Sequence, residues 1–127
     1  MKMRMTCQVF LMTLALGTIA WGVEMPRAIN NDRDLKTALK AAKTPEDHTR
    51  IAAYCNAKAE SLNSKATGYE QAAANSRNTP VVKNIMAPNT AARYEAMAKG
   101  FRQEAQTNTR LAASQEQMAK SIEVASK

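Results

Sequence analysis

The chain has 127 residues and a formal net charge of +7 at neutral pH, with 18 lysine and arginine residues against 11 aspartate and glutamate residues. A nucleophilic hydrolytic site typically needs a histidine and a phosphate-binding loop needs several glycines, but the chain has one histidine and four glycines. No motif of either kind is present in the sequence. We therefore expect no catalytic residue, no bound cofactor and no enzymatic activity.

Residues 1–22 have the order of parts of a secretory signal peptide. Lys2 and Arg4 precede a mostly apolar run from Val9 to Ala20. The run is about a dozen residues, whereas a membrane span needs about 20. Small residues favour cleavage after Gly22, with a cut after Ala20 as the alternative. We expect export to the periplasm or the extracellular space, and loss of the two basic residues leaves a net charge of +5.

The remaining residues, 23–127, fit one small domain, and their composition favours helix. Alanine and straight-chain residues are frequent, and the nearest approach to a strand is the pair Val81 and Val82, which lies between two prolines. The sequence therefore predicts an all-α fold without a sheet.

Two helix starts can be placed from capping residues. The cluster Asn30, Asn31 and Asp32 predicts a short helix over 32–43. The run Thr44-Pro45-Glu46-Asp47 then combines an N-cap, a proline in the first turn and acids that face the helix dipole. It predicts a long helix over 45–77.

A third helix is predicted over 91–124. Pro80 and Pro88 bias the residues before them away from helix, so we expect residues 78–90 to be the connection between the long helices. Asn89 and Thr90 offer the next N-cap. Two long helices joined in this way predict an antiparallel helical hairpin.

Alanine recurs every seven residues in both long helices, at an offset of 46 residues between them. The positions are Ala52, Ala59, Ala66 and Ala73, and then Ala98, Ala105, Ala112 and Ala119. A seven-residue repeat keeps one contact face between two helices, and small residues let their axes come close. The repeat therefore predicts a coiled-coil-like hairpin.

Two versions of this contact remain open. In one, Asn108 and Gln115 lie in the seam, three residues after an alanine. In the other, Met97, Leu111 and Met118 carry the contact and the polar pair faces outward. Either seam buries little apolar area, so the short helix must fold back onto the hairpin, or two hairpins must form a homodimeric four-helix bundle, which we favour.

Cys55 and His48 are the residues with the most versatile chemistry. Cys7 lies in the signal segment, so Cys55 is the only cysteine in residues 23–127, and it is either a small buried seam residue or an interchain disulfide partner. His48 is either a surface residue of the first helical turn or, with Cys55 and methionines across a dimer, a metal ligand. The pair is about 10 Å apart along one helix, too far to chelate a metal alone.

Lys36, Lys40 and Lys43 follow a helical spacing beside apolar residues. Such a stripe is either the solvated face of a packed helix or a surface that binds anionic phospholipid or polysaccharide. The export signal argues against nucleic acid as a partner.

Four motifs carry a resemblance to a known group: Thr44 to His48, Lys58-Ala59, Met86 to Ala91, and Glu116 to Lys120. In these the chain resembles small exported bacterial alanine-rich helical-hairpin proteins of unassigned function, which implies a fold but no binding residue. We therefore expect an exported, non-enzymatic structural or interaction module of the bacterial envelope. The alternatives are a periplasmic metal-binding protein and a binder of anionic envelope surfaces.

Overall fold

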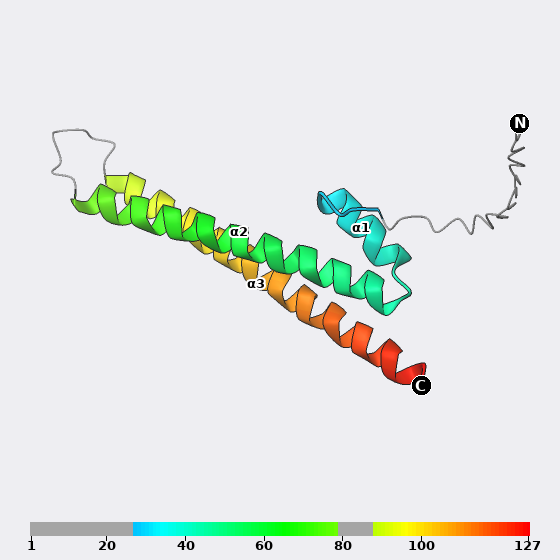
Figure 1. Cartoon of the computed structure of the whole chain (residues 1–127). Helices are drawn as coiled ribbons and strands as arrows, with labels where there is room; N and C mark the ends of the chain where they lie inside the picture. Colours follow the sequence, from blue (N-terminus) through cyan, green and yellow to red (C-terminus); the bar gives the residue numbers. More distant parts are fainter. Residues whose placement is uncertain (1–26, 79–87) are drawn as a thin grey trace, which may run out of the picture.

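The computed structural model describes residues 27–78 and 88–127, which form three helices. α2 (Pro45–Asn78) and α3 (Pro88–Ala125) lie antiparallel along each other, and α1 (Asp32–Ala41) folds back over the N-terminal half of α2 (Figure 1). The predicted all-α helical hairpin with a short N-terminal helix is confirmed. Within the described ranges, none of the helices combines the length and apolar character that crossing a membrane requires.

The first helix begins at the predicted cap. The Asn31 side chain accepts a hydrogen bond from the Asp34 backbone N–H at 2.9 Å, and the Asp34 carboxylate accepts one from the Asn30 N–H at 3.2 Å. These bonds satisfy donors that the first helical turn leaves free. The helix ends at Ala41 rather than at residue 43, because Ala42 adopts an extended backbone conformation.

α2 begins with a reciprocal cap. The Thr44 hydroxyl accepts from the Asp47 N–H at 3.2 Å, while the Asp47 carboxylate accepts from the N–H groups of Lys43 and Thr44, both at 3.1 Å. Asp47 thus takes the part that glutamate plays in a capping box. These backbone donors hold the pKa of Asp47 below its ordinary value.

α3 begins at Pro88, three residues earlier than predicted. Backbone N–H groups in the first helical turn have no partner within the helix, so the missing N–H of proline costs nothing there. Pro88 therefore begins the helix, whereas the sequence analysis assigned it to the connection. The expected connection over 78–90 is thereby shortened at both ends, since α2 also extends to Asn78. Residues 79–87 and the predicted signal segment 1–22 lie outside the described residues.

The alanine repeat forms the contact between α2 and α3. All eight of its alanines are at most 5 % exposed, and we call this set the alanine seam. Its members are Ala52, Ala59, Ala66, Ala73, Ala98, Ala105, Ala112 and Ala119. Methyl side chains along both helices let the backbones approach closely over their whole paired length.

The structure selects the first of the two predicted seams. Asn108 and Gln115 are buried, whereas Met97 and Met118 are 43 % and 46 % exposed. Of the alternative set, Leu111 alone packs against the apolar cluster at the α1 end, where it is partly buried. The methionines therefore do not carry the helix contact. The two buried amides make up part of the seam, as the heptad count from the alanines requires.

α1 supplies apolar cover for one end of the hairpin. Leu35 is buried against Ile51 and Cys55 of α2, in a cluster that also includes Ala52 and Ala112. Burial of a leucine side chain contributes about 1.5–3 kcal/mol, which a contact between alanine methyl groups cannot supply. The fold-back of the short helix, one of the two predicted ways to complete the core, is confirmed.

Ion pairs join the three helices at their margins. Lys58 of α2 contacts Asp32 of α1 at 2.7 Å and Glu104 of α3 at 3.3 Å. Farther along, Arg102 of α3 binds Glu70 of α2 through two nitrogens, at 3.1 and 3.2 Å. Because the Arg102 guanidinium and the Glu70 carboxylate match bidentately, this pair also defines the register of the two long helices.

The seam predicts an intolerance of larger side chains. Ala66→Leu places a branched side chain at a fully buried position and should lower the free energy of unfolding by about 1–3 kcal/mol. Ala74→Leu, at an exposed position of the same helix, is the matched control and should have almost no effect. Urea unfolding followed by circular dichroism measures both, and equal effects would contradict the close contact at Ala66.

The Asp47 cap predicts a dependence on pH. Because the folded state holds the Asp47 pKa below its unfolded value of about 3.8, the charged carboxylate stabilises the fold fully above about pH 5. That stabilisation is lost as the pH falls through the folded pKa. Asp47→Asn should therefore be less stable than the parent chain at pH 6 by a margin that shrinks below pH 4. Glu60→Gln, an exposed change on the same helix, should produce no such trend.

Candidate functional site

His48 and Gln115 form a polar contact inside the hairpin. His48 is only 9 % exposed, and its Nδ1 lies 2.7 Å from Oε1 of Gln115 on α3. An amide oxygen only accepts, so Nδ1 carries the proton. The interpretation of His48 as a surface residue of the first turn is wrong, because its position seven residues before Cys55 turns it into the seam.

A groove lies beside this contact, at the end of the hairpin where α2 begins and α3 ends. It has a volume of about 440 Å³, and no lysine, arginine, aspartate or glutamate is among its lining residues. We call it the terminal groove, and its lining residues are His48, Ser114, Gln117, Met118, Ser121 and Ile122. The half-exposed Met118 side chain also accepts from the Gln115 amide, with 3.9 Å between Nε2 and Sδ.

Cys55 lies in the core and is fully buried. Burial raises the pKa of its thiol, so the sulfur stays protonated at neutral pH. A protonated and inaccessible thiol is a poor nucleophile and a poor metal ligand. Of the two predicted roles, the buried seam residue agrees with the structure, and an interchain disulfide would require the core to open.

The lysine stripe lies on exposed positions of α1 and the turn after it. Lys36, Lys40 and Lys43 are exposed, but the neighbouring Leu35 is buried against α2. Leu39, at 36 % exposure, is left as the large apolar side chain beside the lysines. Binding of an anionic surface at this helix would therefore rest on charge with little apolar insertion.

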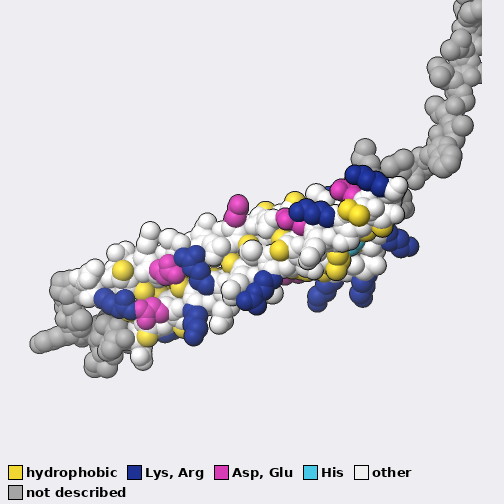
Figure 2. Space-filling model, turned by 90° about the horizontal axis from the view of Figure 1, so that it is seen from below, with side chains coloured by type: hydrophobic (Ala, Val, Ile, Leu, Met, Phe, Trp, Pro, Cys, Tyr) yellow, Lys and Arg dark blue, Asp and Glu magenta, His cyan; other side chains and the backbone are white. Residues whose placement is uncertain are grey.

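Basic side chains are also spread along the length of the hairpin, with acidic ones among them (Figure 2). Several of these are paired across the helices, such as Arg77 with Glu95. Such a mixed surface is typical of a solvated face and does not mark one binding site.

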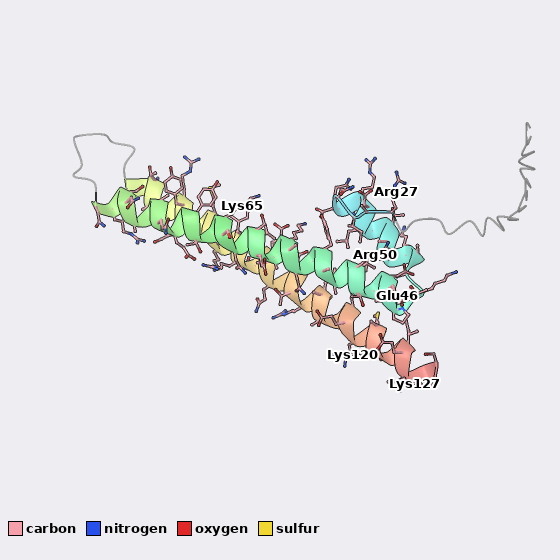
Figure 3. The ribbon with its side chains drawn as sticks, in the orientation of Figure 1. Arg27, Glu46, Arg50, Lys65, Lys120 and Lys127 are labelled. Carbon is pink, nitrogen blue, oxygen red and sulfur yellow. The ribbon has the colours of Figure 1, made fainter. Side chains whose placement is uncertain are left out.

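An aromatic cluster lies toward the connection end of the hairpin, away from α1. The ring centroids of Tyr69 and Phe101 are 5.5 Å apart, and those of Tyr69 and Tyr94 are 5.9 Å apart. Lys65, which lies 5.9 Å from the Phe101 ring centroid, is on α2 between α1 and the connection (Figure 3). The three rings are only partly buried, so this stretch of the hairpin keeps apolar surface in contact with solvent.

A smaller pocket of about 160 Å³ lies between α1 and α2, lined by Arg27, Asp34, Thr37 and Arg50 among others. Nε and Nη1 of Arg50 are buried and have no hydrogen-bond partner among the described residues. The third nitrogen, Nη2, pairs with Asp47 at 3.2 Å. The pocket contains both charge signs and no arrangement that suggests a particular ligand.

The sequence analysis did not predict the aromatic cluster or the His48–Gln115 contact, although the residues of both contacts occupy positions of the heptad pattern. Tyr69 and Phe101 each follow a seam alanine by three residues, as Gln115 does. The heptad pattern does not give the register between the two antiparallel helices, and this register determines which positions of α2 and α3 are in contact. Among the described residues, no group of three or more His, Cys, Asp and Glu side chains is arranged to hold a metal ion.

No protein-family model, no curated protein and no solved structure matches this chain.

The buried polar contact predicts an asymmetry between the two seam amides. Gln115→Leu leaves the Nδ1–H of His48 without a partner and should cost about 1–3 kcal/mol of unfolding free energy. Asn108→Leu is the matched control, because the Asn108 amide donates only to the Glu104 carbonyl of its own helix. That change should be nearly neutral. The double variant His48→Leu/Gln115→Leu should recover most of the loss, and failure to recover would contradict this account of the contact.

Proposed function

We propose that this protein is an exported, non-enzymatic interaction module of the bacterial envelope that associates with a second copy of itself through the aromatic cluster. The observation that carries the proposal is the partial exposure of Tyr69, Tyr94 and Phe101 on a hairpin whose remaining contacts are mostly alanine. Aromatic side chains are enriched at the centres of protein interfaces.

Met97 extends this apolar surface. It lies three residues after Tyr94 and four before Phe101, so the three side chains share one side of α3. Met97 is 43 % exposed, more than a methionine that fills a core would be. None of these residues belongs to the apolar cluster that α1 covers at the other end.

A second copy is the partner that this surface favours. The hairpin buries few large side chains of its own, and packing the aromatic-cluster ends of two hairpins against each other gives these helices an apolar core that one copy lacks. Both copies carry a net positive charge, so repulsion opposes association. We therefore expect added salt, which screens that repulsion, to strengthen the dimer.

The two exposed methionines provide a matched test by sedimentation velocity over a range of protein concentrations. Met97→Gln removes apolar surface beside the aromatic cluster and should raise the dissociation constant of the dimer at least about tenfold. Met118→Gln makes the same change at the opposite end, at a similar exposure of 46 %, and should leave the constant within about twofold.

A parent chain that stays monomeric at every concentration and salt level would overturn self-association. Equal effects of the two substitutions would remove the aromatic cluster as the interface. Export is tested separately, by whether the full chain expressed in a bacterium reaches the periplasm and loses about 22 residues, as the signal-peptide assignment predicts.

A further inference from the structure

Two residues with side chains that can bind a metal ion, one imidazole and one thioether, line the terminal groove. His48 and Met118 both line it, and both are held by the same residue, since Gln115 contacts His48 through its amide oxygen and Met118 through its amide nitrogen. The groove is open and carries no carboxylate.

The hydrogen bond to Gln115 determines what the His48 ring presents. With the proton on Nδ1, the neutral ring has its lone pair on Nε2, and no described residue donates a hydrogen bond to that atom. A histidine that ligates a metal typically has its other ring nitrogen bound to an oxygen acceptor in this way, which fixes the tautomer and the ring orientation. The amide oxygen of Gln115 is such an acceptor at Nδ1 of His48.

We propose that Nε2 of His48 and Sδ of Met118 bind one soft monovalent d10 cation, Cu(I) in the cell and Ag(I) as its laboratory probe. Imidazole nitrogen and thioether sulfur are donors for Cu(I), whereas Mg²⁺ and Ca²⁺ require oxygen ligands. Cu(I) and Ag(I) accept two ligands, whereas a structural zinc site needs four, which the groove does not offer.

This site differs from the one that the sequence suggested. Cys55 is buried in the core and takes no part, and Met118 replaces it as the sulfur ligand. Met97, the other exposed methionine of α3, lies beside the aromatic cluster and does not line the groove. Substitutions of these two methionines therefore distinguish the metal site from the dimer surface. Met118 tests the metal site with Met97 as its control, whereas Met97 tests the dimer surface with Met118 as its control.

The experiment is a silver titration of the full chain carrying Cys7→Ala and Cys55→Ala, so that no thiol competes. Two-dimensional NMR follows the ring nitrogens of His48 and the methyl groups of the methionines, in chloride-free buffer. We expect Nε2 of His48 and the Met118 methyl group to shift together as Ag⁺ is added, while Zn²⁺ at the same concentration has little effect.

Met118→Leu keeps the volume and removes the sulfur, and it should weaken Ag⁺ binding at His48 at least about tenfold. Met97→Leu is the control and should leave the titration unchanged. Unshifted Nε2 in the parent chain, or equal titrations of His48 in the two leucine variants, would overturn the site. Far-UV circular dichroism of each variant establishes that the helices are intact.

Discussion

The close approach of α2 and α3 along the alanine seam is the constraint on which the rest of the structure depends. Methyl side chains bring two long backbones together but bury little apolar area for each residue that becomes ordered. The fold therefore needs support from outside the seam. α1 provides it at one end by burying Leu35, and the pairs made by Lys58 and Arg102 provide it along the margins.

The same constraint makes the two ends of the hairpin chemically different. Toward the connection, the equivalent heptad positions hold Tyr69 and Phe101, whose rings stack on each other and are only partly buried. At the other end, the equivalent heptad positions hold His48 and Gln115, which pair inside. Large apolar surface suited to a protein partner thus lies at one end, and polarised nitrogen and sulfur atoms suited to a small ligand lie at the other.

Most of the architecture could be predicted from the sequence because it depends on local signals. The cap at Thr44 and the seven-residue alanine spacing each act within one helix, and the structure follows both. The interactions of His48 and Tyr69 could not be predicted, because they depend on which residue of α3 lies opposite, and periodicity alone leaves that register open. The start of α3 at Pro88 was misplaced because proline both ends loops and begins helices.

The register between α2 and α3 therefore determines the contacts of His48 and Tyr69, and paired spin labels measure this register most directly. Asn56 and Glu116 hydrogen-bond across the helices at 3.4 Å, whereas Thr109 lies one heptad, about 10 Å, away along α3. With Cys7 and Cys55 replaced by alanine, labels at 56 and 116 should give a single distance that is clearly shorter than labels at 56 and 109. A shorter distance for the second pair would contradict the antiparallel alanine seam described here.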